Sequence, residues 1–214
     1  MRERVPGFCF MAEVYWDLEW TMLQQGFDYA YDKRLYDRLR EGHARPVREH
    51  LHAGLDYQNK LARFLENHDE PRAAADASRP ACTRPPPIIT YLSPGLRFFH
   101  QGQLEGRRKR ISPHLVRAPA EPVDESAPAV LRRSPGGAAG SPAFRDGQWR
   151  LLECAPAWDG NGTSDGFICL VLAAAGTASA CWSTVNYAAN QGPVLRPPAV
   201  RRAARVVRCG CGIG

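Results

Sequence analysis

Two acidic residues stand where apolar runs of the sequence end. Glu13 lies near the end of residues 7–14 (GFCFMAEV), and Asp69 ends residues 62–69 (ARFLENHD). Such runs are typical of buried strands, and in parallel α/β folds the carboxyl ends of the strands carry the functional groups. Carboxyl groups gathered there can protonate a leaving oxygen and stabilise an oxocarbenium ion, which is the chemistry that cleaves glycosidic bonds. The alternative is that each acid is a surface residue that caps the following helix.

Polar and aromatic neighbours extend this candidate site. His68 can donate hydrogen bonds to sugar hydroxyls, and Arg72 can hold a nearby carboxylate in its ionised form. We therefore predict that His68 and Arg72 bind substrate. Four aromatic side chains could stack on sugar rings, although such residues more often belong to the core: Trp16, Tyr91, Phe98 and Phe99.

Strands and helices are expected to alternate along the first half of the chain. Leucine and valine at helical spacing predict helices over residues 33–42 and 46–61, and residues 88–92 close another helix before a Ser-Pro-Gly turn. Apolar or alternating runs predict four strands: residues 7–14, 27–32, 62–69 and 96–103. Because strands and helices follow one another in turn, this order favours a parallel sheet.

The composition changes after residue 118. A connector rich in proline and alanine leads to residues 144–161, whose Asp-Gly turns and alternating apolar residues predict antiparallel strands. We therefore divide the chain into an α/β domain at residues 1–118, a β-rich domain at residues 119–191 and a basic tail at residues 192–214. The tail is expected to be disordered.

Residues 73–87 and 192–214 consist mostly of Ala, Arg, Pro, Gly, Cys and Ser, without the periodicity of their neighbours. Such a composition is what GC-rich coding DNA yields when it is read in a wrong frame. The alternative is a surface loop and a disordered tail. Both interpretations stay open at the level of the sequence.

Charge and cysteine content exclude several classes of protein. The chain of 214 residues has a net charge of +6. Five arginines in the tail account for five of these charges, so the rest of the chain is nearly neutral. The tail has no aromatic residue to stack on bases, so we do not expect it to bind nucleic acid. No run is long enough to span a bilayer and no secretory signal is evident, so a cytoplasmic location is expected. The seven dispersed cysteines predict neither a disulfide framework nor a metal site, and no cofactor is expected.

Three motifs resemble those of the α-amylase family of glycoside hydrolases: AEVYW at residues 12–16, FLENHDEPR at residues 64–72 and LSPGLRFFHQGQ at residues 92–103. The resemblance extends over about residues 7–190, apart from the unusual segment at 73–87. It implies a (β/α)8 barrel followed by a small β-domain.

The resemblance also implies roles for three residues. Glu13 corresponds to the general acid/base, and Asp69 to the carboxylate that distorts the sugar ring and stabilises the transition state. His68 corresponds to a histidine that contacts sugar hydroxyls. The family's nucleophile is an aspartate in a G-F-R-x-D type motif that follows the fourth barrel strand, and neither this motif nor the earlier D-x-x-x-N-H motif occurs in this sequence.

These matches predict the fold and the activity together. Only the last four barrel strands are matched, so we expect an α/β fold that is a partial (β/α)8 barrel followed by a small antiparallel β-domain. We expect a fragment of a retaining glycoside hydrolase or transglycosidase that acts on α-glucosidic bonds of maltooligosaccharides or related glucans and is inactive alone. A half-barrel exposes sheet edges and a core face. We therefore expect the chain to be marginally stable, to self-associate, or to bind a complementing chain that carries the first four barrel units. The alternatives are a non-catalytic remnant or a binding module with a basic tail.

Overall fold

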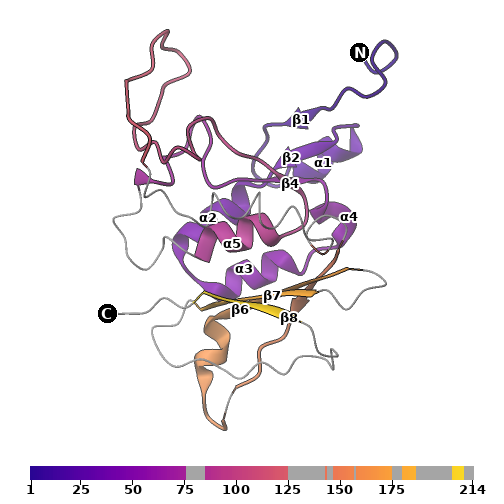
Figure 1. Ribbon diagram of the computed structural model, residues 1–214. Helices are drawn as coiled ribbons and strands as arrows, with labels where there is room; N and C mark the ends of the chain where they lie inside the picture. The colour runs from indigo at the N-terminus through magenta and orange to yellow at the C-terminus, as the bar shows by residue number, and fades with distance from the viewer. Residues whose placement is uncertain are drawn as a thin grey trace.

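A computed structural model describes residues 1–75, 85–124, 143, 147–156, 158–174, 180–186 and 204–209. Within these residues, two four-stranded sheets lie on either side of a layer of helices (Figure 1). Most of the unusual segment at residues 73–87 falls outside the described residues. The prediction of an α/β fold with a parallel sheet and a second sheet is confirmed.

The first sheet contains four parallel strands in sequential order, β1-β2-β3-β4. They are β1 (Met11–Ala12), β2 (Tyr29–Tyr31), β3 (Leu61–Arg63) and β4 (Leu96–Arg97). The ladders are shorter than the apolar runs: β1 ends before Glu13, and residues 64–67 lie beyond the end of β3 although they stay buried. The residues that follow β1 and β3 are therefore free to form loops at one edge of the sheet.

Helices follow the strands. They are α1 (Glu19–Gln24), α2 (Lys33–Glu41), α3 (Ala44–Leu51), α4 (Leu55–Gln58) and α5 (Pro85–Leu92). The α2 helix is as predicted: the Asp32 carboxylate caps it by accepting a hydrogen bond from the Leu35 amide at 3.1 Å, and Gly42 ends it in the left-handed region at φ 78°. The helix predicted over residues 46–61 is instead two helices, because Gly54 is extended between α3 and α4.

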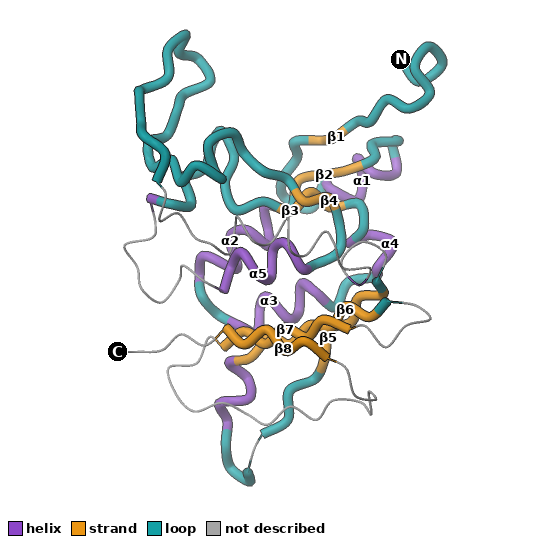
Figure 2. Tube along the Cα trace, viewed as in Figure 1, coloured by secondary structure: helices purple, strands orange, loops and turns teal. Residues whose placement is uncertain are grey.

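The second sheet has the order β5-β6-β7-β8 (Figure 2). It contains β5 (Gln148–Leu152), β6 (Phe167–Ala173), β7 (Ala180–Asn186) and β8 (Ala204–Cys209). The first three strands are antiparallel, as predicted, but β8 is parallel to β7. Strand β8 lies within the tail that the sequence predicts to be disordered. Valines at 206 and 207 favour a strand there, and β8 pairs the otherwise open edge of β7.

One hydrophobic core joins the helices to the second sheet. Its fully buried members come from α2, α3, α5, β6 and β7 and include Leu35, Val47, Leu51, Ile89, Ile168, Leu170 and Val185. The boundary expected at residue 118 therefore does not separate two cores. Because the second sheet covers the helices, the opposite edge and face of the parallel sheet remain for a site.

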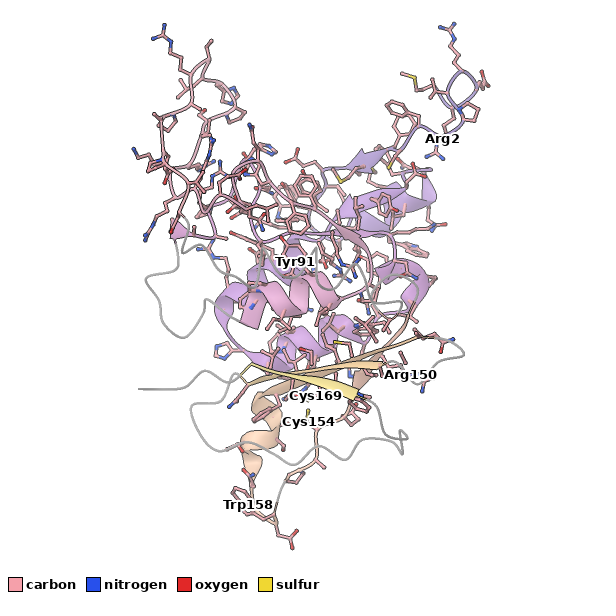
Figure 3. All side chains as sticks on the ribbon, in the orientation of Figure 1. Arg2, Tyr91, Arg150, Cys154, Trp158 and Cys169 are labelled. Atoms are coloured by element: carbon pink, nitrogen blue, oxygen red, sulfur yellow. The ribbon has the colours of Figure 1, made fainter. Side chains whose placement is uncertain are left out.

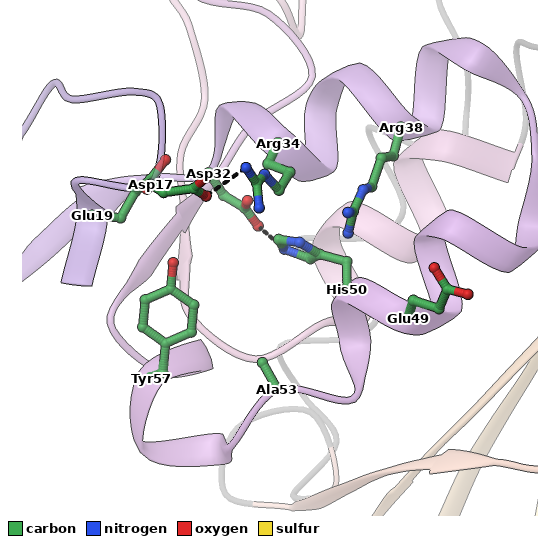
Figure 4. A pocket seen from close by; sticks show the side chains of 9 residues that line it. All are labelled: Asp17, Glu19, Asp32, Arg34, Arg38, Glu49, His50, Ala53 and Tyr57. Carbon is green, nitrogen blue, oxygen red and sulfur yellow. Dashed lines mark hydrogen bonds and ion pairs between the residues drawn. The ribbon is translucent and has the colours of Figure 1, made fainter.

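A buried ionic network ties the outer side of the parallel sheet to its helices. Arg63, whose side chain is 0% exposed, pairs with the Asp32 carboxylate. It also donates to Gln58 Oε1 at 2.7 Å and to the Pro94 carbonyl at 2.9 Å. His50 Nε2 lies 3.0 Å from Asp32 Oδ2. The network borders a polar pocket of about 280 Å³ between α1, α2, α3 and α4 (Figure 4).

This network predicts a pH-dependent stability. Burial, followed by the charges of Arg38 and Arg34, lowers the pKa of His50 from 6.5 to about 4. The unfolded chain takes up this proton near pH 6.5 and the folded chain only near pH 4. The free energy of unfolding should therefore be highest above pH 6.5 and should fall by about 2–3 kcal/mol as the pH is lowered to about 4.

Urea unfolding of the wild type and of His50→Gln at several pH values between these limits measures the effect. The variant should lose most of this pH dependence. His52→Gln is the matched control, since the His52 side chain is 57% exposed, and it should behave as the wild type. Equal pH dependence in the wild type and His50→Gln would show that His50 does not titrate in this range.

Candidate functional site

Three of the four predicted site residues meet at the carboxyl edge of the parallel sheet. Glu13 directly follows β1, while His68 and Asp69 lie in the loop after β3. His68 Nε2 is 3.3 Å from Glu13 Oε1 and 3.5 Å from Asp69 Oδ2. All three side chains are partly exposed, by 42%, 37% and 53% for Glu13, His68 and Asp69. The structure thus brings together two carboxylates and an imidazole that face solvent, and we call them the edge cluster.

Asn67 fixes the loop that carries two members of this cluster. It is 1% exposed, and its Oδ1 accepts hydrogen bonds from the backbone amides of Asp69 at 2.9 Å and Glu70 at 2.8 Å. An Asn side chain that binds the amides two and three residues ahead forms a tight turn. This turn determines where His68 and Asp69 project. The Asn-His-Asp sequence after an apolar run is the signal for this turn, but the sequence analysis gives Asn67 no role.

Tyr15 is a cluster neighbour that the sequence analysis did not identify. Its hydroxyl donates to Glu13 Oε1 at 3.0 Å. Burial raises the pKa of Tyr15, and the hydrogen bond and charge of Glu13 and the charge of Asp69 raise it further, so the phenol stays protonated as a donor. The spacing of Glu13 and Tyr15 is a signal for this contact, because residues two apart in an extended segment point to the same side.

Trp16 follows on a strained turn. Trp16 and Asp17 have φ angles of 61° and 67°, in the left-handed region that disfavours side chains. Each such residue costs about 1–3 kcal/mol, and such strain often occurs at functional sites. The Trp16 side chain is 85% exposed. A large aromatic surface is thus held in solvent three residues after Glu13.

The other three aromatic candidates are packing residues. Tyr91 is 4% exposed and stacks on Phe99, with ring centroids 4.5 Å apart. Phe98 packs on Tyr31 and Phe64. Of the four aromatic residues considered, only Trp16 is therefore free to stack on a sugar.

Arg72 does not join the edge cluster. Its side chain is 1% exposed and donates to Glu66 Oε1 at 2.6 Å. It also donates to the carbonyls of Gln101 at 2.7 Å and Lys109 at 3.2 Å. The structure thus places Arg72 in a buried ion pair, apart from the other three predicted site residues, and substrate binding by Arg72 stays a prediction. Arg72 does hold a carboxylate, but that carboxylate is Glu66, and the contacts tie the loop after β3 to the chain after β4.

The edge cluster has the ligand types of a metal site as well. The donor atoms of Glu13, His68 and Asp69 lie within 4.8 Å of one another, and no other group of three such residues does so in the part of the chain that the structure describes. Imidazole and carboxylate ligands suit zinc. The polar pocket of Figure 4 is a separate feature, since none of the predicted site residues lines it.

In the described part of the chain, no helix combines the length and the hydropathy that crossing a membrane requires. The sequence matches no protein-family model and no curated protein. The fold, however, matches solved structures.

A maltogenic α-amylase of Thermotoga neapolitana matches with a TM-score of 0.63 and 19% identity, over 87% of this chain and 43% of that one. A debranching enzyme of Nostoc punctiforme matches with a TM-score of 0.62 and 14% identity, over 87% of this chain and 43% of that enzyme. Cyclic α-maltosyl-(1→6)-maltose hydrolase of Arthrobacter globiformis matches with a TM-score of 0.61 and 14% identity, over 83% and 41%. The chain thus spans less than half of each of these proteins, and the resemblance drawn from the motifs is confirmed at the level of the fold.

Proposed function

We propose that the chain supplies the C-terminal half of the catalytic barrel of an α-amylase family glycosidase, together with part of the β-domain that follows. Its substrates are maltooligosaccharides or related α-glucans. The observation that carries the proposal is the edge cluster: Glu13 lies more than 50 positions before His68 and Asp69 in the sequence, yet the polar atoms of all three residues meet at the carboxyl edge of a parallel sheet. Catalytic groups occupy this edge in (β/α)8 barrels.

The sheet topology supports a half-barrel. Four parallel strands in sequential order are what consecutive barrel units give, whereas doubly wound sheets reverse their strand order. Among the described residues, β1 and β4 each have one edge without a neighbouring strand. Met11, Leu96 and Phe98 are only partly buried on the face that would line the barrel. Strands from the first four units would cover both edges and this face.

Each residue of the edge cluster then has a role. Glu13 as the acid protonates the glycosidic oxygen while the bond to the anomeric carbon breaks, and as the base it later removes a proton from water or an acceptor sugar. Tyr15 holds the Glu13 carboxyl group in place through its hydrogen bond. The Asp69 carboxylate stabilises the positive charge that develops on the sugar ring, and His68 donates to sugar hydroxyls.

A retaining mechanism needs a further carboxylate to form the covalent glycosyl intermediate. No segment of this sequence matches the nucleophile motif, so in this proposal a segment with the first four barrel units provides it. Without that segment the chain binds glucan but does not turn it over. Whether the complemented enzyme hydrolyses the bond or transfers the sugar depends on acceptor access at the completed site.

Trp16 gives the test of this proposal. If the exposed Trp16 ring stacks on a glucose unit, adding maltoheptaose should change the tryptophan fluorescence of the protein. The Trp16→Ala substitution should then weaken maltoheptaose binding about 10-fold. Trp158→Ala is the matched control, because Trp158 is 51% exposed at the far end of the molecule (Figure 3). Equal affinities for all three proteins would remove Trp16 from the site, and no binding by the wild type would refute a glucan site on this chain.

A further inference from the structure

Two thiols lie in contact in the second sheet. Cys154 follows the end of β5, and Cys169 lies in β6 opposite Leu152. Their sulfur atoms are 3.1 Å apart, and both cysteines are free thiols (Figure 3). At this distance the two sulfur atoms touch but are not bonded. Only a small movement therefore separates them from a covalent bond.

The environments of the two thiols differ in a way that divides their roles. Cys154 is partly exposed, whereas Cys169 is 1% exposed. The hydrogen bond between the two thiols lowers the pKa of Cys154 against the opposing effect of partial burial, and the positive charge of Arg48 lowers it further. The hydrogen bond with Cys154, together with burial, raises the pKa of Cys169. The accessible thiol is therefore the one that ionises first, and its partner is shielded from solvent.

Arg48 is fixed in position. Its Nη1 donates to the carbonyls of Asp165 at 2.7 Å and Phe167 at 2.8 Å. The same Phe167 carbonyl lies 3.8 Å from the Cys154 sulfur. The cation that favours the Cys154 thiolate is thus anchored by the segment that joins β5 to β6, and its side chain is only 18% exposed.

We propose that Cys154 and Cys169 form a redox-active dithiol site, which low-molecular-weight disulfides such as glutathione disulfide oxidise to an intramolecular disulfide. The Cys154 thiolate attacks one sulfur of glutathione disulfide, forms a mixed disulfide and releases one glutathione thiolate. Cys169 loses its proton, attacks the Cys154 sulfur and expels the second glutathione. In sum, two protein thiols and one glutathione disulfide give one protein disulfide and two glutathione molecules.

The bond would cross-link the end of β5 to β6 and close the connection that contains the Asn161–Gly166 turn and the Arg48 contacts. Closing a loop of about 15 residues stabilises a fold by restricting the unfolded chain. The oxidised protein should therefore unfold at a temperature about 6 °C higher than the reduced protein. A reductant should reverse the shift.

The test is to treat the reduced full chain with glutathione disulfide and to map all seven cysteines by peptide mass spectrometry. The wild type should yield a cross-linked Cys154–Cys169 peptide whose mass is two hydrogen masses below the sum of the two separate thiol peptides. Neither Cys154 nor Cys169 should keep a glutathione adduct. Cys9, which is exposed, is the internal control and should retain its adduct. In Cys169→Ala, Cys154 should instead accumulate the glutathione adduct.

Because the substitution of buried Cys169 can itself disturb the sheet, the wild-type peptide map decides the question without any variant. A stable glutathione adduct on Cys154 in the wild type would overturn the proposal. So would a Cys154 that reacts no faster than Cys9, or that is linked to a cysteine other than Cys169. The outcome is independent of the glucan site, since neither thiol belongs to the edge cluster.

Discussion

Replacing Glu13 by glutamine is expected to lower kcat of the complemented enzyme by about 100-fold to 10,000-fold on maltoheptaose. Complemented enzyme here means this chain together with a segment that supplies the first four barrel units and the nucleophile. Glutamine keeps the shape of the side chain and can still accept the 3.0 Å hydrogen bond from Tyr15, but its amide is far too weak an acid to protonate the glycosidic oxygen. The measurement is steady-state release of reducing sugar by both proteins.

A second substrate separates the loss of the acid from a distorted site. Fluoride leaves without protonation, so α-maltosyl fluoride should restore much of the glycosylation rate of Glu13→Gln. Tyr15→Phe is the matched control: it keeps the carboxyl group and loses one hydrogen bond, which should cost about 10-fold or less. If Glu13→Gln lost activity equally on both substrates, Glu13 would be structural and not the acid.

Arg72→Ala is expected to reduce the free energy of unfolding by about 3–5 kcal/mol. The substitution leaves the Glu66 carboxylate, 1% exposed, without its 2.6 Å partner. It also frees the carbonyls of Gln101 and Lys109. Urea unfolding followed by circular dichroism measures the change.

The surface pair Arg45–Glu49 provides the control. Arg45 is 81% exposed and 2.9 Å from Glu49, and exposed ion pairs contribute little, so Arg45→Ala should cost less than about 1 kcal/mol. The double variant Glu66→Gln with Arg72→Met removes both buried charges and should be more stable than Arg72→Ala alone. Similar losses for Arg45→Ala and Arg72→Ala would show that the buried pair does not hold the loop after β3.

The edge cluster could be predicted because two simple rules fix it. Glu13 and Asp69 follow apolar runs, and parallel strands place their carboxyl ends at one edge of a sheet. These rules place both acids at one edge of the sheet, and the turn set by Asn67 then determines where Asp69 projects. The strand order and most helix positions follow from hydrophobic periodicity in the same way.

Other features depend on contacts between distant segments. Arg72 is only three residues from Asp69, but its side chain turns inward to Glu66, a direction that sequence spacing cannot give. The Cys154–Cys169 contact depends on how β5 and β6 are aligned. The shared core and strand β8 likewise arise from packing between parts of the chain that no local pattern connects.

The most direct test of the central claim is isothermal titration of this chain with maltoheptaose and, in parallel, with cellohexaose. The edge cluster as half of an α-glucan site predicts heat with the α-linked sugar at millimolar concentration and none with the β-linked sugar. His68→Ala and Asp69→Asn should each abolish that heat while leaving the unfolding temperature nearly unchanged, since both side chains are partly exposed. Equal heats for both sugars, or binding that survives both substitutions, would contradict the assignment of the site.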